Sequence, residues 1–336
     1  MLPKTIRTMM IKHLIMSNSI DKEKINNLSK EDLLKKREDI LQELKELREN
    51  KKESIEGKTI NNLIDEKRTI EEVIYEVDDR IDIKDVTDVK VLANSNAVVA
   101  LIRKNELIDN GDGTSRLITR PYGPTRNLCK NENFYTQPFA PFCSGILTSN
   151  EIIATAAHCI DNEEDLQNTR FVFGFKMIND NESQTIFKNS DIYQGKNIIK
   201  RVFDENTGSD WVLVKLKERI TNIQPVSINR NGKISNNEDL YVIGHPNGLP
   251  MKYADGARVR DNTPNAYFVA NLDTLTGNSG SPVFNKNTHQ LEGLLVRGER
   301  DFEITEEGCK KSNICPNTGC RGEDCTRVAE FIDLIV

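Results

Sequence analysis

Three short segments of the sequence contain side chains that together could cleave a bond by nucleophilic attack. His158 lies in the segment TAAHC, Asp210 opens the apolar run DWVLVKL, and Ser279 lies in TGNSGSPV. Hydrolysis at a serine needs a hydroxyl nucleophile, an imidazole that accepts its proton, and a carboxylate that orients and stabilises the imidazole. Because the segments supply one of each group, we predict that His158, Asp210 and Ser279 form a catalytic triad.

The glycines around Ser279 predict a place for the negative charge that develops when a carbonyl is attacked. Gly277 and Gly280 allow a sharp backbone turn, so the N–H groups of Gly277 and Ser279 can point at one oxyanion. Each motif alone also has an ordinary structural explanation. The serine turn could be a hairpin, His158 a buried structural histidine, and Asp210 the cap of a strand edge.

The three motifs in this order strongly resemble the trypsin/chymotrypsin-like serine peptidases, with intervals of 52 residues (158 to 210) and 69 residues (210 to 279). That family pairs a cysteine upstream of the histidine with the one directly after it, which here implies a disulfide between Cys143 and Cys159. The tail, residues 326–332, resembles the closing helix of the family. The resemblance covers about residues 97–336 and implies a serine endopeptidase that acts on protein or peptide substrates. We expect it to need no cofactor and no metal.

The residues next to the serine resemble one branch of this family more than another. The sequence of residues 278–283 is similar to the corresponding sequence of bacterial glutamyl-endopeptidase-like members. The animal digestive enzymes have an aspartate before the serine, which pairs with a freshly cut N-terminus. Asn278 occupies that position and cannot form the ion pair, so activation of the animal type is not expected.

The resemblance also implies four residues of the pocket for the substrate side chain before the cleaved bond, the P1 side chain. Asp273, six residues before Ser279, and Glu323, near the pocket floor, would favour Lys or Arg at P1 by charge pairing. Val296 and Gly298 would offer backbone hydrogen bonds to the substrate strand. Two alternatives stay open: Asp273 could be a structural acid bonded to backbone, or the chain could be a glutamyl or other endopeptidase. The pocket strand lacks the histidine that glutamyl-specific relatives use.

The other histidines and cysteines predict structure rather than chemistry. His245 lies in GHPNG, which resembles a structural turn of bacterial members. Zinc is one alternative for the remaining cysteines, although no Cys-x2-Cys knuckle is present, and a disulfide-stapled loop is the other. Disulfides favour a secreted or periplasmic location, while the absence of a convincing signal in residues 1–17 leaves a cytoplasmic one open. Five cysteines cannot all pair, so one thiol is free or intermolecular: Cys129, Cys309, Cys315, Cys320 and Cys325.

The elements that must position these residues are mostly short strands. Tight-turn signals occur at residues 110–113 and 231–232, and many short strands with loops between them predict a barrel or sandwich. The resemblance specifies a chymotrypsin-like double six-stranded β-barrel with a C-terminal helix. The apolar runs that predict strands are residues 97–102, 145–157, 171–175, 211–216, 239–243, 266–270, 280–284 and 291–296.

Residues 1–90 differ in composition from the rest of the chain. They hold 19 Lys+Arg and 21 Asp+Glu, so 40 of 90 are charged, whereas the other 246 residues hold the remaining 58 of 98. We therefore expect two domains, a charged α-helical hairpin or coiled coil at 1–90 and a peptidase domain at 91–336. The hairpin could be a solvated element that packs or self-associates, or a protein-partner site that regulates the peptidase. Its second helix is predicted from a heptad-like seam after Gly57: Ile60, Leu63, Ile70, Ile74, Val77 and Ile81.

Overall composition excludes several classes of protein. A net charge of −6 argues against a dedicated nucleic-acid binder, and no run of about 18 apolar residues predicts a membrane span. The rival to an enzyme is a non-enzymatic binding protein that uses the barrel as a scaffold and the hairpin to recruit partners. Three intact triad residues argue against this rival.

Overall fold

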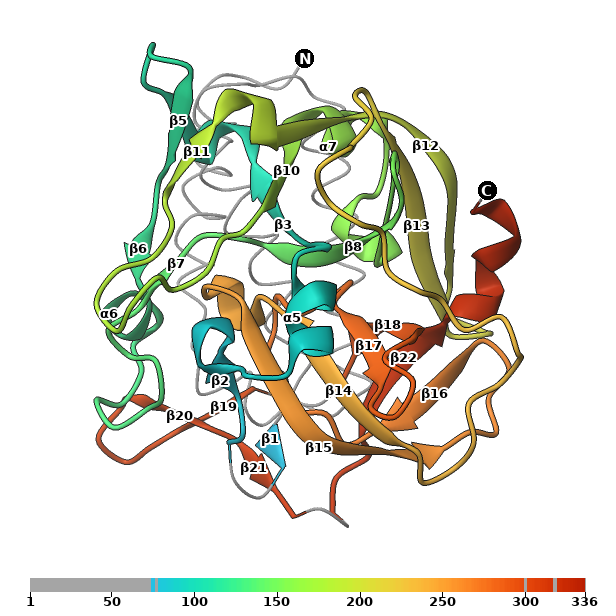
Figure 1. Ribbon diagram of the computed structural model, residues 1–336. Coiled ribbons are helices and arrows are strands. Elements are labelled where there is room, and N and C mark those ends of the chain that lie inside the picture. Colours follow the sequence, from blue (N-terminus) through green and yellow to red (C-terminus); the bar gives the residue numbers. More distant parts are fainter. Residues whose placement is uncertain (1–73, 76–77, 299–300, 317–318, 336) are drawn as a thin grey trace, which may run out of the picture. The chain divides into compact units, whose positions relative to one another are not determined.

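The computed structural model describes residues 74–75, 78–298, 301–316 and 319–335 (Figure 1). The chain divides into two compact units, residues 1–70 and residues 71–336, and the described residues belong to the second. Most of the predicted helical hairpin therefore lies outside the described residues. Within the described ranges, no helix is both long and apolar enough to cross a membrane.

The first barrel closes through six strands in the order β10, β12, β13, β9, β8, β3. Its interior is apolar because β3, β8, β9 and β13 bury nearly every side chain, on continuous runs of Val, Leu and Ile. The strands are β3 (Val98–Arg103), β8 (Cys143–Ser149), β9 (Ile152–Thr155), β10 (Thr169–Phe173), β12 (Ile192–Asp204) and β13 (Ser209–Leu216).

The second barrel has the strand order β14, β17, β18, β22, β16, β15, and pairing of β15 with β14 closes it. The short strand β2 (Ile81–Asp82) adds to the outer side of β15. The two barrels together confirm the predicted double six-stranded fold (Figure 1). Its strands are β14 (Asp239–Gly244), β15 (Lys252–Asp261), β16 (Tyr267–Ala270), β17 (Pro282–Asn285), β18 (Leu291–Arg297) and β22 (Glu323–Arg327).

Each of the eight predicted runs contains at least part of a strand, but the sequence pattern missed β12, β15 and β22. These three are rich in Lys, Arg, Asp and Glu, and β12 and β15 mix buried with exposed positions, so they lack a continuous apolar run. The run 145–157 is two strands with a turn between them. The expected C-terminal helix is two 3₁₀ turns, η6 (Val328–Glu330) and η7 (Ile332–Leu334). Phe331 separates them because its ring packs on Trp211 and its backbone is not helical.

The described positions of the predicted helical seam, Ile74 and Ile81, are not helical. Ile74 lies in β1 (Ile74–Tyr75), which pairs in parallel with β21 (Ile314–Cys315), and Ile81 lies in β2. The prediction of a helical seam is therefore wrong at these two positions, since pairing with strands of the second unit satisfies their backbone groups instead. The compact unit also begins well before residue 90, the boundary expected from composition.

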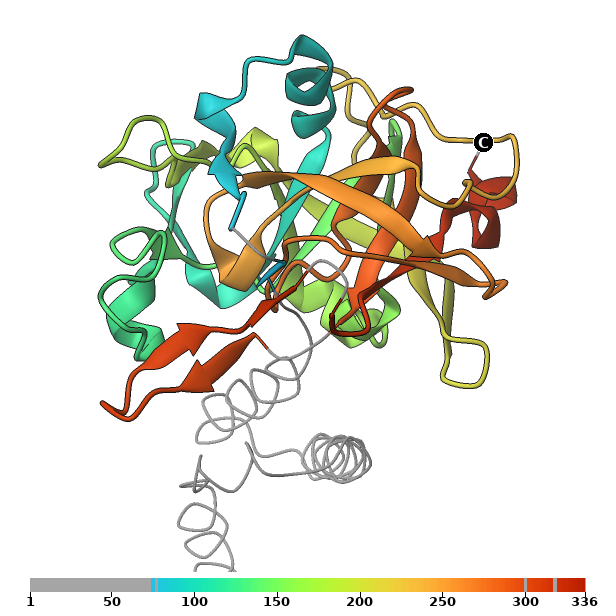
Figure 2. The same ribbon diagram turned by 90° about the horizontal axis from the view of Figure 1, so that it is seen from below.

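Smaller elements surround the barrels. A three-stranded sheet and two hairpins form insertions, and Figure 2 shows the β19–β20 hairpin extending from the barrels. Disulfides join Cys129 to Cys309 and Cys315 to Cys320, while Cys325 in β22 is a buried thiol. The elements are α5 (Val89–Ser95), β4 (Leu107–Asp109), β5 (Thr114–Leu117), β6 (Arg120–Pro121), α6 (Tyr122–Arg126), β7 (Pro138–Phe139), α7 (Glu163–Asn168), β11 (Ile186–Lys188), β19 (Phe302–Ile304) and β20 (Lys310–Ser312).

Candidate active site

His158 and Asp210 meet at the ends of two paired strands of the first barrel. β9 leads into the 3₁₀ turn η3 (Ala157–Cys159), which carries His158, and Asp210 is the second residue of β13. The Nδ1 atom of His158 lies 2.7 Å from Oδ2 of Asp210. A carboxylate can only accept, so Nδ1 carries the proton and Nε2 is left as the basic nitrogen of the ring.

The surroundings of Asp210 keep its carboxylate ionised. Its Oδ1 accepts hydrogen bonds from the N–H groups of Ala157 at 2.7 Å and His158 at 3.2 Å. Burial alone would raise the pKa of Asp210. The charge and hydrogen bond of His158 and the charge of Arg297 outweigh burial, so the pKa of Asp210 lies below its ordinary value. An ionised Asp210 can both orient an imidazole and stabilise its protonated form.

Ser279 lies in the turn before β17 and against the same part of the first barrel. Its carbonyl accepts a hydrogen bond from the N–H of Ser144 at 2.9 Å. The same oxygen lies 3.7 Å from Sγ of Cys159, the residue after His158. The fold therefore brings the three predicted triad residues into one region, two from the first barrel and one from the second.

The backbone around Ser279 has the conformation that its glycines predict. Gly277 and Gly280 have φ angles of +92° and +81°, in the left-handed region. A Cβ atom at Gly280 would overlap Thr155 Oγ1 and the carbonyl of Ser144. Among the described residues, the N–H groups of Gly277 and Ser279 donate to no other group, so they are available to a developing oxyanion.

Asn278, the residue before the serine, is held by a hydroxyl group. Its side chain is buried, and its Oδ1 accepts a hydrogen bond from Ser281 Oγ at 3.0 Å. Its N–H donates to the carbonyl of Leu275 at 3.1 Å. A neutral amide with local partners thus occupies the position where the digestive enzymes have an ionised aspartate.

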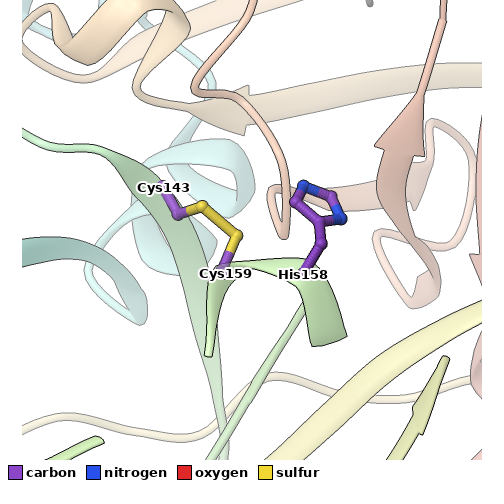
Figure 3. A group of neighbouring side chains, drawn as sticks. All are labelled: Cys143, His158 and Cys159. Atoms are coloured by element: carbon purple, nitrogen blue, oxygen red, sulfur yellow. A yellow bond between two sulfur atoms is a disulfide. The ribbon is translucent and has the colours of Figure 1, made fainter. Parts of the chain in front are cut away.

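A disulfide between Cys143 and Cys159 fastens the His158 turn to β8 (Figure 3). One nitrogen of His158 and the two sulfur atoms lie within 4.8 Å of one another. These residue types could bind a metal as thiolates, but sulfur atoms joined to each other offer no thiolate. The arrangement therefore braces the histidine turn.

The four predicted pocket residues separate into two groups. Glu323 opens β22 and is fully buried, and its carboxyl group lies directly against Gly298. Val296 lies in β18 at a bulge in the pairing with β22. Asp273 instead directs both carboxylate oxygens to backbone N–H groups, of Tyr75 at 2.6 Å and of Asp79 at 3.0 Å. This is the structural alternative considered for Asp273.

His245 has the structural role expected for it. Its ring is completely buried, stacks on Phe175 and donates from Nδ1 to the carbonyl of Leu249 at 3.0 Å. Burial lowers the pKa of His245 to about 4, so the ring is neutral. The turn that follows supports the serine loop, because the N–H of Asn247 donates to the carbonyl of Thr276.

Two contributors to the site were not predicted. Arg297 donates to Asp324 Oδ2 at 2.9 Å and to the carbonyl of Gly208 at 2.6 Å, which holds its charge near Asp210. Thr326 Oγ1 donates to the carbonyl of Asp210 at 3.1 Å. The only signal for Arg297 in the sequence is its place in the pocket strand, next to Gly298.

Comparisons with known proteins gave a family match and a structural match. Residues 143–294, which include His158, Asp210 and Ser279, match the family described as trypsin-like peptidase domain. Among solved structures, a Vibrio cholerae protease, VesB, is 14% identical with a TM-score of 0.47, over 77% of this chain and 67% of that one. No curated protein matches the sequence. Residues 143–294 are therefore similar to the trypsin-like peptidase domain.

Proposed function

We propose that the chain is a serine endopeptidase in which Ser279 is the nucleophile, His158 the general base and Asp210 the residue that orients it. The observation that carries this proposal is the hydrogen bond between His158 Nδ1 and Asp210. This hydrogen bond leaves Nε2 of His158 as the basic nitrogen. Cys159, the next residue, contacts the carbonyl of Ser279.

The reaction proceeds through an acyl-enzyme. Ser279 Oγ attacks the peptide carbonyl while His158 Nε2 takes its proton, and the N–H groups of Gly277 and Ser279 hold the oxyanion. The protonated His158 then gives its proton to the leaving amine. Water then attacks the ester carbonyl while His158 accepts its proton, and His158 returns that proton to Ser279 Oγ as the bond between the acyl carbon and Oγ breaks. Loss of one oxyanion donor typically costs about 10²–10³ in turnover.

The pocket supports a preference for Lys or Arg at P1. The buried carboxyl group of Glu323 lies against Gly298, where it would meet a basic side chain in a poorly solvated slot. The backbone of Val296 and Gly298 would pair with the substrate strand at the bulge of β18. Glu323 is therefore proposed as the main acid of the pocket.

Residues 1–70 form the other compact unit and carry much of the charge of the N-terminal region. We assign them a regulatory or partner-binding role. Comparing the full chain with residues 71–336 tests this role, because that cut keeps the whole peptidase unit. Equal activity and equal partner binding in the two forms would overturn it.

Labelling with a fluorophosphonate probe tests the triad. The full chain should form an adduct at Ser279, whereas Ser279→Ala should form none. Absence of any adduct in the unchanged protein, with and without residues 1–70, would overturn the enzyme proposal and favour a binding protein. A peptide library then tests P1: Glu323→Gln should lose its preference for Lys and Arg while retaining the probe adduct.

A further inference from the structure

A short segment before the first barrel contacts the loop that leads to Ser279. We call residues 74–75 and 78–82 the strap. At one end β1 pairs with β21, and at the other β2 pairs with β15 of the second barrel. Ile74 and Tyr75 are buried, so the strap is part of the peptidase unit rather than a loose linker.

Buried charges hold the strap in its position. Within the strap, Arg80 donates to both carboxylate oxygens of Asp78, at 2.7 and 2.6 Å, and the Arg80 guanidinium lies over the ring of Phe134 outside the strap. The ammonium group of Lys252 is buried against Asp82. Release of the strap would separate or expose these charge pairs. The pairs therefore favour the position in which the strap is packed against the second barrel.

Asp273 anchors the middle of the strap. Its carboxylate accepts from the N–H groups of Tyr75 and Asp79, and its side chain is 4% exposed. Both oxygens of Asp273 thus already accept from the strap. Asp273 lies at the start of the loop that runs to Ser279.

The carboxyl group of Asp79 lies beside this anchor. Burial and then the neighbouring charge of Asp273 raise the pKa of Asp79 to about 8. Asp79 is therefore mostly protonated at neutral pH. Asp78 and Asp255 also face Asp79 and favour its neutral form, while the charge of Arg80 stabilises the ionised Asp273.

The same loop is held again closer to the nucleophile. Thr276 donates its N–H to both oxygens of the buried Asp301, each at 3.0 Å. The carbonyl of Thr276 accepts from Asn247, as described above. The segment from Asp273 to Ser279 is thus fixed at its start by the strap and in its middle by Asp301.

From this arrangement we propose that the strap is a positioning element of the active site, with Asp273 as its anchor rather than as a ligand for the P1 side chain. Docking of the strap fixes the loop that carries the N–H groups of Gly277 and Ser279. The proposal rests on the serine peptidase function proposed above. Asp273 and Asp79 then position the serine loop for every substrate, whatever its P1 residue.

Asp273→Asn in the full chain tests this assignment. An amide has one acceptor oxygen, so one of the two strap N–H groups loses its partner. We expect kcat to fall alike for peptides with Lys, Arg or a neutral residue at P1, up to on the order of 10²-fold, with little change in KM. A loss confined to kcat/KM for Lys and Arg peptides would overturn the proposal and make Asp273 a P1 ligand.

Asp79→Asn is a milder variant that keeps a hydrogen-bond donor but cannot ionise. In the unchanged protein, deprotonation of Asp79 would place two like charges together and loosen the strap, so activity should fall as pH rises through about 8. The variant should retain activity to higher pH, and an unchanged alkaline limb would count against the proposal. Lys84→Ala, on an exposed ion pair beyond the strap, is the matched control and should behave as the unchanged protein.

Fluorophosphonate labelling distinguishes failure of the peptidase proposal from failure of the positioning proposal. If the unchanged protein does not react with a fluorophosphonate, the peptidase proposal fails. If it reacts and Asp273→Asn reacts at the same rate, only the positioning proposal fails. Circular dichroism on each variant shows whether a loss of reaction reflects unfolding.

Discussion

The regions around Asp210 and Asp273 look alike but have different chemistry. Both carboxylates are buried, and both accept two backbone N–H groups. The third partner differs: His158 lies beside Asp210, whereas another acid, Asp79, lies beside Asp273. The pKa of Asp210 is lowered because the charge and hydrogen bond of His158 outweigh burial, whereas burial raises the pKa of Asp273. A buried carboxylate acquires its role from the charge of its neighbours, not from its place in a motif.

Replacing each acid by its amide tests this comparison most directly. Asp210→Asn should lower kcat by roughly 10⁴-fold, because an amide can donate to the ring and leave the wrong nitrogen of His158 protonated. Asp273→Asn should cost far less, within the limit given above. Steady-state hydrolysis of one peptide by both variants measures the difference, and equal losses would remove the distinction between the two acids.

Gly280 lets the serine loop pack closely against the first barrel. Gly280→Ala should lower both stability and activity strongly, because its φ is +81° and the new Cβ would overlap Thr155 and Ser144. Gly174→Ala is the matched control, since Gly174 has a φ of +80° but open space around it. Thermal unfolding should show a small shift for the control and a much larger one for Gly280→Ala; similar shifts would mean that only backbone strain matters.

Removing the positive charge near Asp210 should make it more like Asp273. We expect Arg297→Met to raise the pKa of Asp210, and so to move the acid limb of the activity profile to higher pH, with a loss of about tenfold at neutral pH. Arg258→Met, which breaks an exposed ion pair with Asp239, is the control. An unmoved acid limb in Arg297→Met would show that His158 alone keeps Asp210 ionised.

The smallest expected effect concerns stability rather than turnover. The pKa of Asp79 is raised in the folded chain, so its contribution to stability is fully present below the ordinary carboxyl range. That contribution declines with rising pH and is lost through about 8. Urea unfolding of Asp79→Asn across this range should therefore show a weaker loss of stability with pH than the unchanged protein. Parallel curves would contradict the assigned proton.

The sequence was sufficient to predict the double barrel and the grouping of His158 with Asp210, and it was insufficient for the strap. The first two depend on continuous apolar runs and on short motifs at strand ends. The strap depends on contacts between Asp273 and residues 198 and 194 positions away, which no local pattern records. The spacing of Ile74 and Ile81 fitted a helix, yet pairing with distant strands determined their structure.

The local partners of Asn278 bear on how the loop that carries Ser279 becomes organised. In enzymes that need a new N-terminus, activity begins with a cut and cannot be withdrawn by rejoining the chain. Here a hydroxyl of the same loop, Ser281 Oγ, holds the residue before the nucleophile. The described partners of Asn278 therefore come from its own loop, and their hydrogen bonds do not involve a new N-terminus.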